Sequence, residues 1–198
     1  IGNISVADFK EDAGELLKGA PNSKVELTYK RQGEIKKTTL TRGAIEIKAV
    51  PFYKLINGST GYIVLSQFNR NASAETLQAF RDLKEEGADK IILDLRGNPG
   101  GLLSEAINVA NIFIPEGELI TSTKSAVEKY NQTFFTTRKA IDSEIPLVVL
   151  INGRSASASE IVAGSLQDLD RAVVIGARSF GKGLVQRPKD LTYGTQLK

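Results

Sequence analysis

The sequence predicts an α/β fold in which helices pack on a sheet. From Gly58 onward, strand-like apolar segments alternate with amphipathic helix-like segments, which is the pattern of such folds. Two of these strands, at 90–95 and 147–151, are nearly continuous apolar runs, as in a sheet that is covered on both faces. Hydrophobic residues make up 41% and charged residues 25% of the 198 residues, as in an ordinary soluble domain.

Before this pattern begins, residues 1–48 predict a small α+β unit. Apolar spacing predicts a helix over Asp8–Leu17, and alternation predicts strands near 25–29 and 35–40 with a turn between them. One helix and a few strands bury little core, so we expect this unit to be incomplete.

The second part of the chain predicts its elements in the order strand, helix, strand. A strand at 61–65 precedes a helix at 73–86, for which Ser73 is the expected N-cap. The remaining expected elements are a strand at 90–95, a helix at 102–113, strands at 117–122, 133–137 and 147–151, a helix at 158–169 and a strand at 172–176.

Composition excludes several classes of function. The 26 basic residues are interspersed with 23 acidic ones, which indicates a solvated surface rather than a nucleic-acid site. Without cysteine there is no disulfide and no thiolate metal site. The given sequence shows no signal-peptide pattern, and no apolar run in it reaches the ~18 residues of a membrane helix. The chain begins at Ile1 and has no methionine, so we expect an excised or processed piece.

Three loops that follow predicted strands carry the candidate chemistry. They are the glycine-rich loop at 97–101, the serine cluster at 155–160 and the loop at 176–183. Ligands of α/β sheets bind beyond the carboxyl ends of the strands, so these loops are candidates for one shared site.

The serine cluster gains interest from the absence of histidine and cysteine, which excludes a Ser-His-Asp triad and a thiol nucleophile. A catalytic serine would need another base, and lysine is the known substitute. A serine near 157 would stand at a helix N-terminus, where unpaired N–H groups can stabilise an oxyanion. The alternative is that these serines only cap the helix.

Lys182 is the candidate base. Its pKa would have to fall from about 10.4, as happens on burial in an apolar pocket, and Phe180, Leu184 and Val185 could supply one. The alternative is an ordinary surface lysine. The N–H groups of Gly100 and Gly101 are candidate oxyanion donors, although a simple turn explains them as well.

A rival reading of the third loop is a phosphate-binding loop, because 176–182 fits G-x-x-x-x-G-K. Gly183 follows the lysine where that motif needs serine or threonine for magnesium, and Arg178 and Phe180 crowd the loop. These departures disfavour nucleotide binding.

Taken together, four segments over 61–198 resemble the catalytic core of the C-terminal processing peptidases, the tail-specific serine proteases of family S41. The segments are 61–63, Asp94–Gly101, Ser155–Ile161 and Phe180–Gln186. The resemblance implies a crotonase/ClpP-like ββα core and a Ser-Lys dyad acyl-enzyme mechanism with no metal or organic cofactor.

On these motifs the resemblance also implies the role of each residue. Ser157 matches the nucleophile, Lys182 the general base and Gln186 the residue that orients the lysine. The oxyanion hole would be formed by the N–H groups of Ala158 and the Gly100–Gly101 region. Asp168 matches an acidic position with a supporting role.

For the whole chain, the resemblance implies residues 1–45 as the C-terminal half of a PDZ domain and 46–198 as a peptidase core cut short at its C-terminus. The expected substrates are proteins or peptides with exposed C-termini, and no nucleic acid is expected. A homo-oligomer and membrane association of a full-length parent fit the family, and the bacterial cell envelope is the expected location. The alternatives are an inactive fragment or homologue that binds peptides, and crotonase-type acyl-CoA chemistry on a similar core.

Overall fold

The computed structural model describes residues 1–9, 12–45, 47–186 and 189–197. The chain divides into two compact units, Ile1–Ile47 and Lys48–Lys198. Within the described ranges, no helix is both long and apolar enough to cross a membrane.

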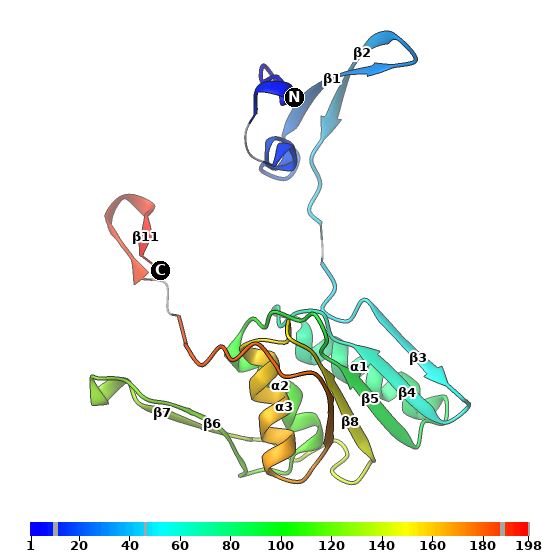
Figure 1. The fold of residues 1–198 in the computed structure, drawn as a ribbon, viewed down its shortest axis with the longest axis vertical. Helices are drawn as coiled ribbons and strands as arrows, with labels where there is room; N and C mark the ends of the chain where they lie inside the picture. Colours follow the sequence, from blue (N-terminus) through cyan, green and yellow to red (C-terminus); the bar gives the residue numbers. More distant parts are fainter. Residues whose placement is uncertain (10–11, 46, 187–188, 198) are drawn as a thin grey trace. The chain divides into compact units, whose positions relative to one another are not determined.

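The first unit is a β-hairpin accompanied by two short 3-10 helices (Figure 1). Strands β1 (Lys24–Arg31) and β2 (Glu34–Thr41) pair antiparallel around the predicted turn. The predicted helix over Asp8–Leu17 is wrong in its described part. That part forms the 3-10 helices η1 (Val6–Asp8) and η2 (Ala13–Leu17). Residues 10–11 of the prediction lie outside the described residues. No residue of η2 is buried, so nothing supplies the packing that a regular helix of this length needs.

The second unit is built on a five-stranded sheet of order β3-β4-β5-β8-β9. Its strands are β3 (Phe52–Ile56), β4 (Thr60–Val64), β5 (Lys90–Asp94), β8 (Leu147–Ile151) and β9 (Val173–Gly176). β3 pairs antiparallel with β4, and all the other neighbours are parallel. The sequence pattern did not predict β3.

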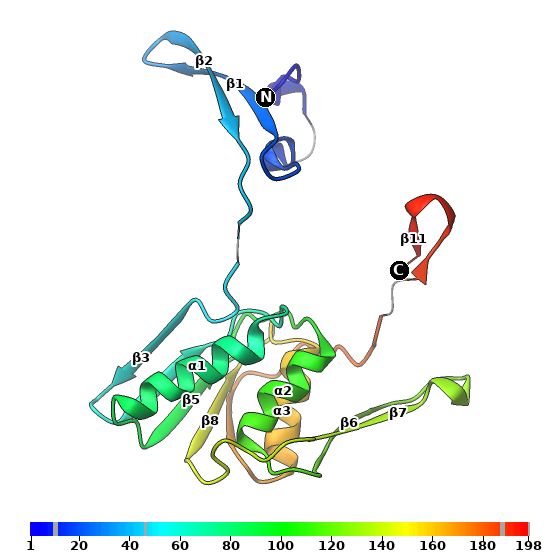
Figure 2. The same cartoon turned by 180° about the vertical axis from the view of Figure 1, so that it is seen from behind.

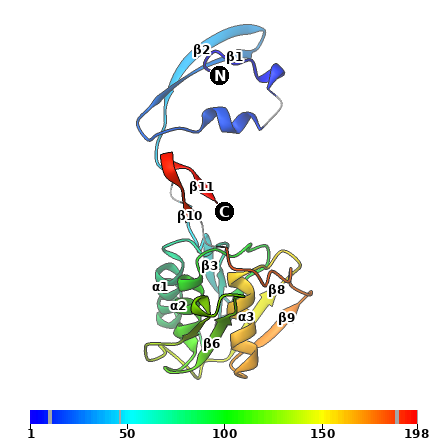
Figure 3. The ribbon, with the colours of Figure 1, turned by 90° about the vertical axis from the view of Figure 1, so that its left-hand side faces the viewer.

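Three helices connect the parallel strands and confirm the predicted α/β class. They are α1 (Ala72–Glu85), α2 (Leu103–Phe113) and α3 (Ala158–Asp168). α1 begins one residue before the expected cap Ser73, and its N-cap is Asn71. The strand order never reverses, so right-handed crossovers place all three helices on one face of the sheet. Figures 2 and 3 show α1 and α2 on this face.

The core lies between these helices and the sheet. It includes Ile63, Leu93 and Val149 from the strands, and Phe80 and Phe113 from the helices, all nearly inaccessible. The apolar strands predicted a sheet that is covered on both faces, but in the described residues the helices cover only one. Ile92 and Val148, which point to the other face, are only partly buried.

Between α2 and β8 the chain forms a hairpin that extends from the sheet (Figure 1). Its strands are β6 (Leu119–Thr123) and β7 (Gln132–Phe135), paired antiparallel, with the 3-10 helix η3 (Glu128–Tyr130) between them. β6 also contacts α3. The short elements β10 (Lys189–Asp190), η4 (Thr192–Gly194) and β11 (Gln196–Leu197) follow β9.

Candidate active site

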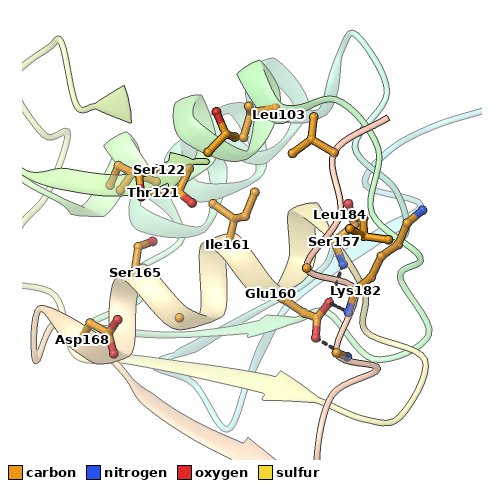
Figure 4. Close-up of a pocket in the computed structure, with 16 residues that line it drawn as sticks. Leu103, Thr121, Ser122, Ser157, Glu160, Ile161, Ser165, Asp168, Lys182 and Leu184 are labelled. Atoms are coloured by element: carbon orange, nitrogen blue, oxygen red, sulfur yellow. Dashed lines mark hydrogen bonds between the residues drawn. The ribbon is translucent and has the colours of Figure 1, made fainter. Parts of the chain in front are cut away.

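The carboxyl ends of the parallel strands bring the three predicted loops together. The glycine-rich loop follows β5, the serine cluster follows β8 and the lysine loop follows β9. Ser157 and Lys182 line one cavity of about 470 Å³ with residues of α2, α3 and β6 (Figure 4). The cavity is lined by Leu103, Ile120–Thr123, Ser157, Glu160, Ile161, Gly164, Ser165, Asp168 and Gly181–Val185.

Ser157 occupies the N-cap position of α3 in a strained conformation. Its φ of 56° and ψ of −113° are rare for a residue with a side chain. Such a conformation costs about 1–3 kcal/mol and persists only where its surroundings fix it. It presents the serine at the head of a helix, where the N–H groups of the first turn are exposed to the cavity.

The two flanking serines fix this turn and have no access to the cavity. Both are fully buried. Ser155 Oγ donates to Leu95 O at 2.8 Å and accepts from Asn152 N at 2.9 Å. Ser159 Oγ donates to Asn98 O at 3.0 Å. Of the three serines in the cluster, only Ser157 lines the cavity.

The glycine-rich loop lies directly against the turn that carries Ser157. A Cβ atom on Gly100 would stand 2.6 Å from Ala156 O and 2.9 Å from Ser157 Cβ. One on Gly101 would stand 2.3 Å from Phe68 O. Both residues also have positive φ. Glycine is therefore required at each position for two reasons, the close approach and the backbone conformation.

Asn98, whose role the sequence analysis missed, holds this loop to its neighbours. It is fully buried, and its Nδ2 donates to Leu65 O at 2.8 Å. Its Oδ1 accepts from Gly100 N at 2.8 Å. The expected part of Gly100 in an oxyanion hole would therefore require that bond to break. The N–H groups of Gly101 and Ala158 have no such acceptor within the described part of the chain.

Lys182 lies in an exposed segment without regular secondary structure. In Figure 4 its side chain extends away from α3. The described residues include no hydrogen bond between Lys182 Nζ and Ser157 Oγ. The rival phosphate-binding loop is disfavoured as well, because no α-helix follows the lysine in the described residues.

Glu160, which the sequence analysis assigned no role, joins the serine to the lysine segment. Its carboxylate accepts from Ser157 N at 2.7 Å and from Lys182 N at 2.9 Å. It also accepts from Ser179 Oγ at 2.8 Å and Gly181 N at 2.6 Å. The signal that could have found it is the serine–glutamate spacing of a helix capping box at 157 and 160.

These bonds determine the charge of Glu160. Partial burial disfavours the ionised carboxylate, but the hydrogen bonds from Ser179 and from the three backbone N–H groups outweigh it. They hold the pKa of Glu160 below its usual range, so the group is an anion at neutral pH.

A second carboxylate, Asp94, lies at the end of β5. Burial opposes its ionisation, but hydrogen bonds from Arg96 and Tyr62 outweigh this and keep the pKa of Asp94 below its usual range. Arg96 donates to both carboxylate oxygens, with Nη2 at 2.6 Å from Oδ2. This pair anchors the start of the glycine-rich loop.

The other predicted residues lie further from Ser157. Gln186 is exposed, and Val185 is the last residue of its segment to line the cavity. Asp168 lines the cavity at the far end of α3, eleven residues and so about 16 Å along the helix axis from Ser157. It therefore does not touch the candidate nucleophile.

No group of three or more acidic, histidine or cysteine side chains is placed to bind a metal ion among the described residues. The chemistry available in the cavity is that of a hydroxyl at a helix N-terminus, backbone N–H donors and an amine. This set fits acyl transfer through a covalent intermediate.

Residues 59–198 match the peptidase family S41. The chain belongs to this family. It is 41% identical over 189 residues to the carboxyl-terminal-processing protease of Synechocystis, which covers 93% of the chain. It is 36% identical over 184 residues to a probable CtpA-like serine protease of Staphylococcus aureus, covering 92% of the chain. The chain spans only 44% and 36% of the lengths of these relatives.

Solved structures of S41 proteases share the fold. A photosystem II D1 C-terminal processing protease matches with a TM-score of 0.65 at 33% identity, covering 89% of this chain and 49% of that one. An S41 protease of Bacteroides fragilis matches with a TM-score of 0.65 at 20% identity, covering 85% of this chain and 50% of that one. The second likeness concerns the fold alone.

Proposed function

We propose that this chain carries the catalytic centre of a serine endopeptidase that cleaves proteins recognised through their C-terminal tails. Family membership supports a serine peptidase of the C-terminal processing class. The single observation that carries the proposal is the strained Ser157 at the head of α3, in one cavity with Lys182.

In the proposed reaction, the Lys182 amine in its neutral form removes the proton from Ser157 Oγ, which attacks the scissile carbonyl. The N–H groups of Ala158 and Gly101 donate to the oxyanion that forms. Lys182 then protonates the departing amine, and water hydrolyses the acyl-enzyme with Lys182 again as base.

This mechanism requires the Lys182 side chain to turn from solvent toward Ser157. Glu160 already holds the main chain of Lys182 beside the head of α3, so the turn involves mainly side-chain torsions. The apolar side chains of Leu184 and Val185 in the same cavity would then favour the neutral amine by excluding water. Gln186 is proposed to orient the amine once it has turned.

The proposal also covers the first unit of the chain and the setting in which the protein acts. Residues 1–45 are proposed as the C-terminal half of a PDZ domain, on the strength of the sequence resemblance and the hairpin they form. Action on C-termini is proposed because the Synechocystis relative is a carboxyl-terminal-processing protease. The bacterial cell envelope is proposed from the sequence resemblance alone.

The test is covalent labelling of the chain with an activated phosphonylating probe, with the adduct located by mass spectrometry. We expect one adduct, on Ser157, and no labelling of Ser157→Ala. Lys182→Ala should slow labelling and peptide cleavage by about 10³-fold or more, because the serine loses its base. Ser165→Ala is the matched control, since Ser165 lines the same cavity and should label normally. Undiminished labelling of Ser157→Ala or Lys182→Ala would contradict the dyad.

A further inference from the structure

The cavity beside Ser157 continues as a groove along one face of α3. Every third or fourth residue of the helix lines it, from Ser157 through Ile161, Gly164 and Ser165 to Asp168 (Figure 4). The opposite wall is strand β6, through Ile120–Thr123. A groove between a helix face and a strand can accommodate a peptide in an extended conformation.

Gly164 keeps the middle of this groove open. A Cβ atom placed on it would meet no heavy atom within 4 Å. A glycine inside a helix destabilises it by about 1 kcal/mol relative to alanine. No neighbouring atom lies close enough to Gly164 to require a residue without a side chain. The space beside Gly164 is therefore available to a ligand that passes from Ser157 toward Asp168.

Asp168 lies at the far end of the groove as an uncompensated negative charge. It is exposed and forms no ion pair within the described residues. It also occupies the last residue of α3, where the helix dipole disfavours an anion, and the last turn contains no basic residue. The nearby Arg171 guanidinium is turned elsewhere, toward the carbonyl oxygens of Phe113 and Ile145.

The other carboxylate of the groove is not available to a ligand in this way. Glu160 accepts four hydrogen bonds from its own chain. Asp168 is thus the group in the groove whose charge a ligand can neutralise, and the local helix field adds to its attraction for a cation.

We propose that the groove along α3 is a substrate subsite in which Asp168 binds a lysine or arginine side chain of the peptide. This inference rests on the proposed peptidase function. An extended peptide advances about 3.3 Å per residue, and Asp168 lies about 16 Å from Ser157 along the helix, so the cationic residue stands four to six residues from the scissile bond.

The first test measures binding apart from catalysis. Fluorescence anisotropy is measured for two labelled 18-residue Ala/Leu/Ser peptides as the Ser157→Ala chain is added. The peptides have no other charged side chain and differ only in one central lysine or glutamine. We expect the lysine peptide to bind about 3- to 5-fold more tightly at low salt, as for a partly exposed ion pair, and the preference to shrink at 0.5 M NaCl.

Variants in the same background locate the effect. Asp168→Asn should abolish the preference, and Asp168→Lys should reverse it toward a glutamate peptide. Asp170→Asn is the matched control, because Asp170 is also exposed but does not line the groove. Gly164→Phe should weaken both peptides by filling the space beside the helix. Equal binding of the lysine and glutamine peptides, or a preference that survives in Asp168→Asn, overturns the subsite.

Cleavage mapping gives the second readout. The unaltered chain should cut the lysine peptide four to six residues from the lysine, and Asp168→Asn should spread the cuts. If Ser157 takes no probe and no peptide is cut, the proposed function fails, yet the anisotropy series still decides the subsite. If Ser157 reacts normally and the lysine preference is absent, only the subsite fails.

Discussion

The turn that carries Ser157 and the segment that carries Lys182 lie beside each other, but different interactions hold them in place. The serine turn is tied to the chain just after β5 by buried bonds: Ser155 Oγ donates to Leu95 O, and Ala156 N and Ser159 Oγ donate to Asn98 O in the glycine-rich loop. The lysine segment is exposed, and three hydrogen bonds to the Glu160 carboxylate, from Ser179 Oγ, Gly181 N and Lys182 N, attach it to α3. Buried networks fix one geometry, whereas exposed bonds to a single carboxylate allow a segment to open.

The largest effect is expected from breaking the serine side at Asn98. Asn98→Leu leaves Gly100 N and Leu65 O without partners in a buried site, and each such group costs about 1–3 kcal/mol. We expect urea denaturation to show a loss of about 3 kcal/mol, with probe labelling of Ser157 lost in the folded fraction. Asn71→Ala is the control, because Asn71 caps α1 without a side-chain bond, and it should change stability by less than about 0.5 kcal/mol.

A smaller effect on stability is expected from breaking the lysine side at Glu160. Glu160→Gln replaces one acceptor oxygen by an amide that can only donate, so the N–H groups on that side lose their acceptor. We expect a loss of about 1 kcal/mol, with faster hydrogen exchange at Gly181 and Lys182 and unchanged exchange in β5 and β8. Labelling of Ser157 should fall at least tenfold.

Glu144→Gln is the matched control for this change, because Glu144 is an exposed glutamate whose Oε1 accepts only from its neighbour Ser143. Exchange at Gly181 and Lys182 should be as in the unaltered chain. If Glu160→Gln left those two amides fully protected, the carboxylate would not be what holds the lysine segment.

The smallest effect on the lysine segment is expected from lowering the pH. The pKa of Glu160 is lower in the folded chain than in the unfolded one, so its stabilisation is complete above the unfolded value, about 4.3, and is lost as the pH falls through the folded value. NMR amide shifts of Gly181 and Lys182 should therefore stay constant near neutrality and move together only below pH about 4. The same shifts should not titrate in this way in Glu160→Gln.

The sequence predicted best the parts whose signal is local. Strand β8 (Leu147–Ile151) is a continuous apolar run between turns, and both of its ends were placed correctly. The sequence also predicted that three features lie at one edge of the sheet, because each follows a parallel strand. They are Ser157, Lys182 and the glycine-rich loop. The S41 family and the α/β class follow from the same ordered motifs.

The parts that were missed depend on partners distant in the chain. Glu160 gains its role only when residues 179–182 fold back onto α3, and Asn98 only when its loop meets Leu65 and the serine turn. The helix expected near Asp8–Leu17 lacked a surface to pack on and shortened to 3-10 turns. Propensity and periodicity contain no information on such long-range contacts.

The single direction of strand order in the sheet has a consequence for how the protein is made. β4, β5, β8 and β9 lie in space in the order in which they are translated, and each adds its part of the site at the same edge. A nascent chain therefore acquires the glycine-rich loop first, the turn that carries Ser157 second and the lysine last. Any chain that ends before residue 182 has Ser157 without Lys182, so biosynthesis itself delays the proposed reactive pair until the sheet is finished.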